Sequence, residues 1–236
     1  MAVYDNEDFN VEFKPDDSPL TKADTAANEI IKQTLLPSGL PILSEEGRQV
    51  PYAERKNWSN YWLVDPLDGT KEFIKRNGEF TVNIALMKEN RPVAGVVFAP
   101  SLDTLYYGSI ENGASKIING IEEPLLAANN TDLNQLMGKE KVVIVASRSH
   151  SNPETENFIA QYKTHELCSM GSSLKFMLLA DGKADIYPRI APTMEWDTAA
   201  AHAILNALNR KVFQYNTAEE LIYNKENLLN PYFVAL

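Results

Sequence analysis

The chain has 236 residues, of which 44% are hydrophobic, enough for a large core in one compact unit or two small domains. Its 22 basic and 32 acidic residues give a formal net charge of −10, which argues against a nucleic-acid polymer or an anionic membrane as the resting partner. The sequence has neither a run of about 18 apolar residues nor a charged-then-apolar leader, so we expect no transmembrane segment and no secretion.

Cys168 is the only cysteine, which excludes an internal disulfide bond. For a single cysteine, a buried free thiol is a more common role than a catalytic nucleophile. A protein without disulfides suits the reducing cytosol, so we expect a cytoplasmic location. The sequence leaves weak peripheral membrane association and the oligomeric state open.

Hydrophobic spacing predicts a first helix over residues 23–36, ended by the Pro37-Ser38-Gly39 segment. Asp24 falls in the first turn of this helix. A short apolar strand over residues 40–43 follows, and the acidic pair Glu45-Glu46 stands at its end.

The most informative segment is residues 61–70, where an apolar strand runs into Asp65-Pro66-Leu67-Asp68-Gly69. The proline restricts the chain beyond Asp65, and Gly69 permits a backbone conformation that most residues avoid, so both carboxylates sit on a stiff turn. With the Leu67 carbonyl between them, the turn offers the hard oxygen ligands that Mg²⁺ or Mn²⁺ prefers. The same five residues also suit an ordinary surface turn, so they do not decide the question alone.

The segment after this turn predicts a helical turn over residues 70–74, whose free N–H groups favour a phosphate. Thr70 fits the N-cap of this helix. Strands over residues 80–87, 92–99 and 102–109 then predict an antiparallel meander.

Polar residues 121–139 separate this meander from an apolar strand over residues 141–147, and we place a domain boundary there. The prediction is an N-terminal α+β domain over residues 1–138 and a C-terminal α/β domain over residues 139–236. The second domain is expected to alternate helices over 153–163, 174–181 and 198–208 with a strand over 184–187. Asp197 stands where the N-cap of the last helix belongs.

Three of these segments together resemble the inositol monophosphatase superfamily, whose pattern is Glu-Glu, then Asp-Pro-x-Asp-Gly-Thr, then Trp-Asp-x-Ala-Ala. They occur here in the same order, as Glu45-Glu46, residues 65–70 and residues 196–200. The chain is similar in particular to the CysQ-type 3′(2′),5′-bisphosphate nucleotidases, over residues 18–24, 61–86, 147–150, 171–176, 187–189 and 229–231. The resemblance implies a layered α/β/α/β/α sandwich of the α/β (α+β) class.

The resemblance also implies a set of metal ligands and catalytic residues. Two or three Mg²⁺ ions, with Mn²⁺ as a substitute, would be held by Glu45, Asp65, the Leu67 carbonyl, Asp68 and Asp197. Thr70 would orient the attacking water, and Asp24, to a lesser degree Glu45, would accept its proton or support a third ion. The same metal chemistry implies inhibition by Li⁺.

The pocket that the resemblance implies would hold a phosphorylated nucleotide. Its substrate-binding residues would be Asp68, Gly69, Thr70, Ser147, His150, Ser172, Lys175, Arg189 and Asp197. The implied reaction removes the 3′-phosphate of adenosine 3′,5′-bisphosphate to give AMP and phosphate, which clears a byproduct of sulfate assimilation. An inositol monophosphate or fructose-1,6-bisphosphate phosphatase, and a non-catalytic nucleotide- or metal-binding regulator, remain alternatives.

The chain departs from the family pattern at two places. Only Met1 and Ala2 precede the segment that matches the family at residues 3–5, where relatives usually have an additional helix. If that helix is lacking, we expect an uncovered hydrophobic face. Ala201 replaces a usual glycine, and its methyl group would modestly reduce affinity if the base lies close to it.

Overall fold

Apolar residues that alternate along the chain build a sheet of seven strands, in the order β3-β4-β5-β6-β7-β8-β9. The computed structural model describes residues 1–5, 12–13, 19–128, 133–146 and 152–236. The first pair of strands is parallel and the others are antiparallel. The strands are β3 (Ile42–Ser44), β4 (Asn60–Asp68), β5 (Thr81–Lys88), β6 (Arg91–Ala99), β7 (Thr104–Ser109), β8 (Gly113–Ile118) and β9 (Ile121–Pro124). The three predicted strands of the meander are confirmed as β5, β6 and β7, but the structure adds β8, where no element was predicted, and β9, in a stretch that was predicted to be a polar connection.

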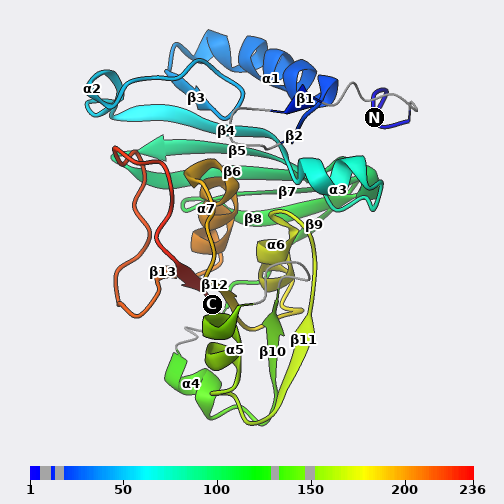
Figure 1. The fold of residues 1–236 in the computed structure, drawn as a ribbon, viewed down its shortest axis with the longest axis vertical. Coiled ribbons are helices and arrows are strands. Elements are labelled where there is room, and N and C mark those ends of the chain that lie inside the picture. The colour runs from blue at the N-terminus through cyan, green and yellow to red at the C-terminus, as the bar shows by residue number, and fades with distance from the viewer. Residues whose placement is uncertain (6–11, 14–18, 129–132, 147–151) are drawn as a thin grey trace.

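The two faces of this sheet are covered differently. Helix α1 (Lys22–Leu35) lies on one face, against β3 and β4, whereas α6 (Leu174–Ala180) and α7 (Ala199–Ala207) lie on the other (Figure 1). Along β5, the residues on the α7 side are buried, and the intervening Val82, Ile84 and Leu86 stay partly exposed. The outward side of the sheet is therefore an incompletely covered apolar face.

Small residues allow α7 to pack directly on the sheet. A Cβ atom at Gly95 of β6 would lie 2.1 Å from the main-chain oxygen of Ala200, so only glycine fits at that position. The alanines that begin α7 are themselves buried. This close contact fixes the start of α7, and with it the residues just before the helix, relative to the strands.

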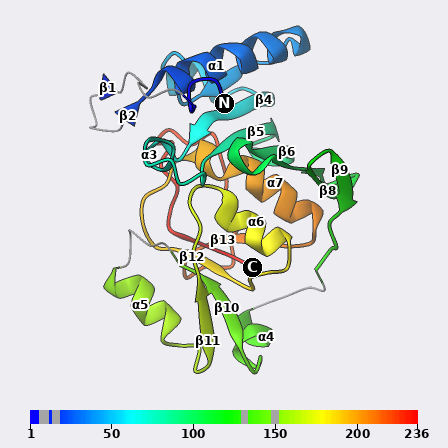
Figure 2. The ribbon, with the colours of Figure 1, turned by 90° about the vertical axis from the view of Figure 1, so that its right-hand side faces the viewer.

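A second sheet lies on the far side of α6 and α7 (Figure 2). Strands β10 (Val142–Val145) and β11 (His165–Cys168) pair in parallel, and β12 (Tyr187–Arg189), β14 (Phe233–Ala235) and β13 (Val212–Gln214) form an antiparallel group. A bridge between Ile144 and Ile186 joins the two groups.

The faces of this second sheet belong to different parts of the core. Ile144 and Val234 cluster with residues of α4 (Leu133–Met137) and α5 (Pro153–Ile159), whereas Val145 and Phe233 cluster with α6 and α7. The layers therefore run α1, sheet, α6 and α7, sheet, α4 and α5. This order confirms the predicted α/β/α/β/α sandwich, while the division into two domains at residue 138 stays a prediction.

Several predicted boundaries shift in the structure. The helix predicted over residues 153–163 ends at Ile159, and the strand predicted over 184–187 begins only at Tyr187. The remaining elements are β1 (Glu12–Phe13), β2 (Pro19–Leu20), η1 (Leu36–Ser38), α2 (Tyr52–Arg55), α3 (Thr70–Ile74), η2 (Pro100–Leu102) and η3 (Glu195–Asp197). No helix in the described part of the chain combines the length and apolar character that crossing a bilayer requires.

Cys168 is a free, half-buried cysteine on β11, where its Sγ lies 3.7 Å from the main-chain oxygen of Ile144. Partial burial raises the pKa of its thiol, which disfavours the thiolate. The thiol is less buried than predicted, and the raised pKa gives no support to a nucleophilic role.

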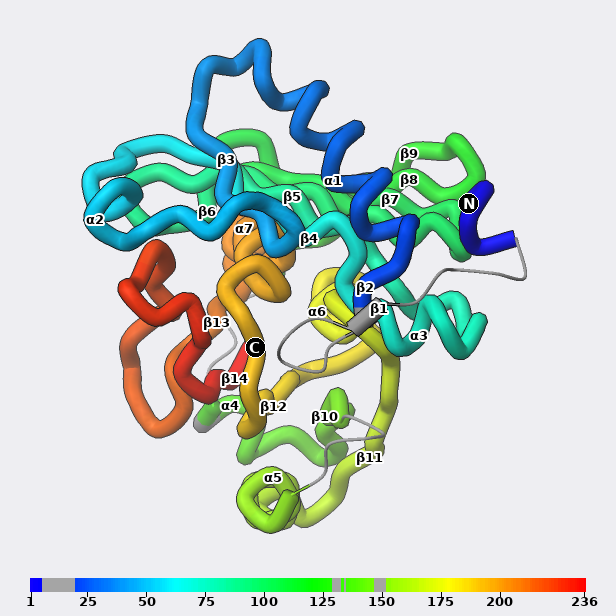
Figure 3. Tube along the Cα trace, turned by 45° about the horizontal axis from the view of Figure 1, so that its top comes forward, coloured from blue at the N-terminus to red at the C-terminus, as the bar shows by residue number. Residues whose placement is uncertain are grey.

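Three segments that are distant in sequence meet between the two sheets. The end of β4, the residues that lead into α6 and the turn before α7 lie together near the centre of the chain trace (Figure 3). Hydrogen bonds from Ser173 to Asp68 and to the main chain of Asp197 connect them.

Candidate active site

The turn at the end of β4 holds its two aspartates in a defined arrangement. The pairing of β4 with β5 shifts register between Asp65 and Asp68, and the Leu67 N–H donates a 2.9 Å hydrogen bond to Oδ1 of Asp65. Gly69 has φ of 91°, and a Cβ atom there would lie 3.2 Å from the main-chain oxygen of Glu79. Glycine therefore meets both a backbone and a space requirement at this turn.

Asp197 joins these two residues from the other side of the molecule. Carboxylate oxygens of Asp65, Asp68 and Asp197 all lie within 4.8 Å of one another. The predicted N-cap role of Asp197 is wrong, because it ends the 3₁₀ helix η3, Thr198 occupies the cap position, and Oδ2 of Asp197 accepts from the Met194 N–H at 2.9 Å. That local bond holds the side chain against η3.

The three carboxylates repel one another electrostatically. Burial raises the pKa of Asp65 well above its usual range, and the charges of Glu45, Asp68 and Asp197 raise it further. Burial also raises the pKa of Asp197 well above its usual range, and the charge of Asp68 raises it further. Among the described residues, no Lys or Arg forms an ion pair with any of the three clustered aspartates. An all-oxygen, anionic donor set of this kind fits a hard divalent cation.

Glu45 and Leu67 lie next to this cluster. The N–H of Glu45 donates to the main-chain oxygen of Val64 at 3.1 Å, which places the end of β3 beside β4. Its carboxylate contributes to the raised pKa values of both Asp65 and Asp197. The structure thus brings Glu45 near the three aspartates, as the sequence predicted.

Asp24 and Thr70 form a second part of the site. The Thr70 hydroxyl lies 3.2 Å from Oδ1 of Asp24 and 3.4 Å from the Leu67 carbonyl oxygen. The residue Asp24 is 1% exposed. Its Oδ2 accepts hydrogen bonds from the Thr21 N–H, at 2.8 Å, and from the Thr21 hydroxyl. The N-cap alternative for Thr70 is wrong, because Gly69 occupies that position and α3 begins at Thr70.

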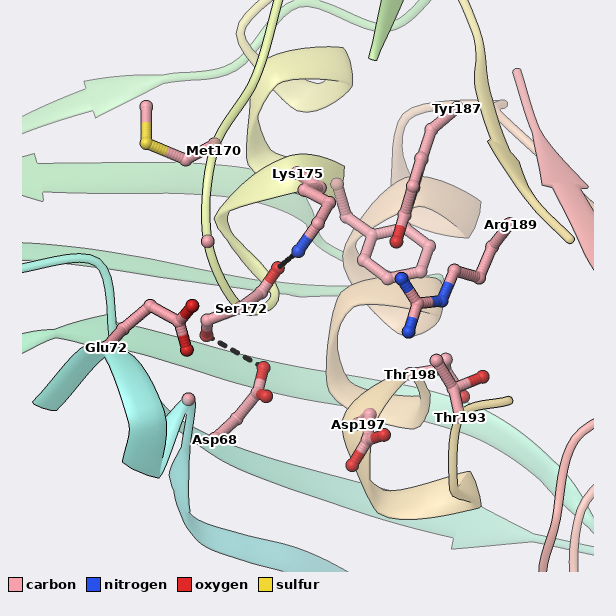
Figure 4. Close-up of a pocket in the computed structure, with 13 residues that line it drawn as sticks. Asp68, Glu72, Met170, Ser172, Lys175, Tyr187, Arg189, Thr193, Asp197 and Thr198 are labelled. Carbon is pink, nitrogen blue, oxygen red and sulfur yellow. Dashed lines mark hydrogen bonds between the residues drawn. The ribbon is translucent and has the colours of Figure 1, made fainter. Parts of the chain in front are cut away.

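A cavity of about 160 Å³ opens between the aspartates and the second sheet. Figure 4 shows Asp68 and Asp197 on one side of it and Lys175 and Arg189 on the α6 and β12 side. Ser172 lines the same cavity and donates its hydroxyl hydrogen to Oδ2 of Asp68 at 2.7 Å. The cavity therefore has an acidic wall and a basic wall.

The two cationic side chains of the basic wall, Lys175 and Arg189, donate hydrogen bonds to main-chain oxygens. Nζ of Lys175 donates to the main-chain oxygen of Ser172 at 2.9 Å, and burial lowers the pKa of this lysine to about 8. Arg189 donates through one guanidinium nitrogen to the main-chain oxygen of Pro192 at 3.0 Å. Its Nε is buried and has no hydrogen-bond partner among the described residues.

Ser147 and His150, the other predicted pocket residues, lie outside the described residues. The sequence prediction also missed cavity residues, among them Glu72, Met170, Tyr187, Thr193 and Thr198. Tyr187 carried a signal, because it stands two positions before Arg189 on the same strand face. Asn83, whose Nδ2 lies 3.4 Å from Oδ2 of Asp68, was also missed, although it is a polar residue in the buried series of β5.

Comparisons with known proteins agree with this geometry. A model of the inositol monophosphatase family matches residues 1–232. The 3′(2′),5′-bisphosphate nucleotidase CysQ of Salmonella typhimurium LT2 is 45% identical over 99% of this chain and 92% of that protein. The protein of the same name from Escherichia coli K12 is 43% identical, again over 99% of this chain and 92% of its own length.

Solved structures give the same assignment. The crystal structure of CysQ from Bacteroides thetaiotaomicron, a bacterial member of the inositol monophosphatase family, has a TM-score of 0.84 and 46% identity and covers 99% of this chain and 90% of that one. A staphylococcal inositol monophosphatase-1 in a LiCl-soaked inhibitory complex has a TM-score of 0.74 at 20% identity, covers 96% of this chain and 80% of that one, and shares the fold. The chain belongs to the inositol monophosphatase family.

Proposed function

We propose that this chain is a Mg²⁺-dependent phosphatase that removes the 3′-phosphate of adenosine 3′,5′-bisphosphate and releases AMP and phosphate. The main support is the convergence of Asp65, Asp68 and Asp197 beside a cavity whose opposite wall carries Lys175 and Arg189. Relatives that are 43% and 45% identical carry the name 3′(2′),5′-bisphosphate nucleotidase. The reaction would clear a byproduct of sulfate assimilation, and its partner is a small phosphorylated nucleotide.

In this proposal, four side chains and one carbonyl hold two or three Mg²⁺ ions, which Mn²⁺ can replace. Asp65 would be the central ligand of this set, since it is the most buried of the three aspartates and its pKa is raised by Glu45, Asp68 and Asp197 together. Glu45, the Leu67 carbonyl, Asp68 and Asp197 would supply the other ligand oxygens. When bound, such ions neutralise phosphate oxygens, acidify a water molecule and stabilise the leaving oxygen.

Thr70 and Asp24 are the proposed proton-handling residues. Because the Thr70 hydroxyl donates its hydrogen to Asp24, the lone pairs of its oxygen are left to accept a hydrogen from the attacking water. The water oxygen forms the new bond to phosphorus, the bond between phosphorus and the 3′ oxygen breaks, and the proton of the water passes through Thr70 to Asp24. The leaving 3′ oxygen takes up a proton from solvent.

The basic wall supplies the proposed specificity. A bisphosphorylated nucleoside has a second anionic group that inositol monophosphate lacks, and Lys175 and Arg189 provide two cations for it. Ser172 lies between these cations and the acidic wall. Ser147 and His150 are proposed to contact the sugar and base.

A phosphate-release assay over a small substrate panel tests this function. The panel contains adenosine 3′,5′-bisphosphate, inositol monophosphate and fructose 1,6-bisphosphate, each with millimolar Mg²⁺ and with EDTA. We expect the highest kcat/KM for the nucleotide and no turnover without the metal. Faster turnover of inositol monophosphate or fructose 1,6-bisphosphate would show that the nucleotide is not the preferred substrate. Nucleotide binding without any phosphate release would indicate a regulator.

A further inference from the structure

The hydroxyl of Ser173 lies between Asp68 and Asp197, the two aspartates that form the acidic wall of the cavity. Ser173 is the residue before α6 and is 1% exposed. Its Oγ lies 2.9 Å from Oδ2 of Asp68, 2.8 Å from the main-chain oxygen of Asp197 and 2.8 Å from Nδ2 of Asn83. These partners belong to β4, η3 and β5 respectively.

The orientation of the Asn83 amide determines how the hydroxyl hydrogen is used. Nδ2 of Asn83 lies 3.4 Å from Oδ2 of Asp68 as well as near Ser173, so the nitrogen rather than the oxygen of the amide faces the carboxylate. Ser173 Oγ therefore accepts from Asn83 and has one hydrogen for its two acceptors. Those acceptors are the carboxylate of Asp68 and the main-chain oxygen of Asp197.

Ser173 also holds Asp68 through its main chain. Its N–H donates to Oδ2 of Asp68 at 2.7 Å, and the Ser172 hydroxyl donates to the same oxygen at 2.7 Å. Oδ2 of Asp68 is thus occupied by protein donors, whereas no donor among the described residues bonds to Oδ1, which can serve as the ligand atom of this side chain. The Asp197 side chain is held separately by the Met194 N–H, so the hydroxyl of Ser173 anchors the backbone that carries it.

We propose that Ser173 is a positioning residue that sets the separation of Asp68 and Asp197, and thereby the affinity of the site for a divalent cation. The inference rests on the proposed function, because it assigns these two aspartates as metal ligands. Replacing Ser173 with alanine leaves the Asn83 amide and the Asp197 carbonyl buried without this partner. The two ligands then lose a shared contact, although each keeps its other hydrogen bonds.

Calorimetric titration with Mn²⁺ alone tests the inference without relying on turnover. We expect Ser173→Ala to weaken Mn²⁺ binding on the order of 10- to 100-fold, the range typical of contacts that orient metal ligands. The Mg²⁺ concentration for half-maximal activity should rise with it, and saturating Mg²⁺ should restore most of kcat. Ser173→Thr, which keeps the hydroxyl, should bind Mn²⁺ more tightly than Ser173→Ala.

Thr104→Val is the matched control. Thr104 begins β7 of the seven-stranded sheet and is also buried. Its hydroxyl donates to the main-chain oxygen of Leu102 at 2.9 Å. This variant loses a comparable buried hydrogen bond away from the aspartates, so its Mn²⁺ affinity should equal that of the wild type even if its melting temperature falls.

The outcomes separate the two proposals. Wild-type affinity for Mn²⁺ in a folded Ser173→Ala variant overturns the positioning role and leaves the proposed function intact. A wild-type protein that binds no Mn²⁺ overturns both. Should Ser173→Ala not fold, Ser173→Thr and Ser173→Cys are compared instead. These two side chains are similar in volume to each other but differ in hydrogen-bond strength, so equal Mn²⁺ affinities contradict the inference.

Discussion

The Thr70 hydroxyl donates a 3.2 Å hydrogen bond to Oδ1 of Asp24, which joins the start of α3 to the first turn of α1. Asp24 in turn caps the main chain of its own helix through Oδ2, where it accepts the Thr21 N–H. The same carboxylate therefore stabilises a helix with one oxygen and orients the Thr70 hydroxyl with the other. A pair held this rigidly keeps the lone pairs of Thr70 in a fixed direction.

The first prediction concerns the Thr70 hydroxyl. Thr70→Val keeps the shape of the side chain but removes the hydroxyl, so we expect kcat to fall roughly 10²- to 10⁴-fold, the usual contribution of a positioned proton-transfer group. Steady-state kinetics on the bisphosphate measure this, and Mn²⁺ titration should show nearly unchanged metal affinity. Thr70→Ser serves as the control and should retain most activity. A Thr70→Val enzyme with wild-type kcat would remove Thr70 from the mechanism.

The second prediction concerns Asp65, whose carboxylate is buried among other acids. Its folded-state pKa lies above the unfolded value, so its ionised form at neutral pH destabilises the metal-free fold. Asp65→Asn removes this repulsion and keeps an oxygen that accepts from the Leu67 N–H. The melting temperature of the metal-free protein should therefore rise, by roughly 2–4 °C for each kcal/mol gained in the free energy of unfolding.

The same Asp65→Asn variant should lose activity. One missing charge weakens every ion that Asp65 contacts, and the loss should exceed the roughly 10- to 100-fold typical of a supporting contact. Differential scanning calorimetry with and without Mg²⁺ reports both effects, because added Mg²⁺ should raise the melting temperature of the wild type far more than that of the variant. Substantial turnover in the variant contradicts the proposed central role of Asp65 among the metal ligands.

The elements that the sequence predicted well are those with strong periodicity or recognisable caps. Helix α1 has a capping box between Thr21 and Asp24, and β5 alternates buried and partly exposed residues over its whole length. Strand β9 was missed because all four of its residues are exposed, so it has no apolar alternation and is held by its pairing with β8. Edge strands of this kind are specified by their neighbours.

The site shows a similar division. Asp65, Asp68 and Asp197 were predicted from the family pattern, yet the cap role given to Asp197 was wrong because a short 3₁₀ turn precedes α7. Ser173 could not be predicted, since its role depends on a contact with Asp197 that only the packing of α6 beside α7 creates. Ligand types were readable in the sequence, whereas the contacts that orient them were not.

The third prediction concerns Arg189 on the basic wall of the cavity. Arg189→Ala removes a cation that we propose faces the second phosphate, so KM for adenosine 3′,5′-bisphosphate should rise on the order of 10- to 100-fold, as expected for a charge-assisted hydrogen bond. A simple phosphate monoester has no such group, and its kinetics should change little. Equal losses on both substrates would show that Arg189 does not contact the 5′-phosphate.

The fourth prediction concerns lithium. Li⁺ suits an oxygen-lined site of the size that holds Mg²⁺, but it has half the charge, so it should occupy the site without acidifying water as well. Phosphate release at fixed Mg²⁺ should therefore fall with added LiCl, while the same concentration of NaCl has little effect. Insensitivity to LiCl would count against the proposed metal site.

The fifth prediction concerns the protonation of Lys175. Burial lowers the pKa of this lysine to about 8, so it loses its charge as pH rises through that value. Because kcat/KM reports groups of the free enzyme, kcat/KM for the bisphosphate should decline above pH of about 8. Lys175→Met should lack this decline and show a lower, flatter profile, whereas an unchanged alkaline limb in the variant would assign the titration to another group.

The stability of the metal-free protein provides an independent check on Lys175. Its folded pKa of about 8 lies below the ordinary value of 10.5, so between these values the unfolded chain binds more protons than the folded one. Stability therefore rises with pH across that window. Urea unfolding at several pH values should show this rise in the wild type and a smaller one in Lys175→Met. Identical slopes in the two proteins would mean that Lys175 titrates normally in the folded state, and that its charge persists at alkaline pH.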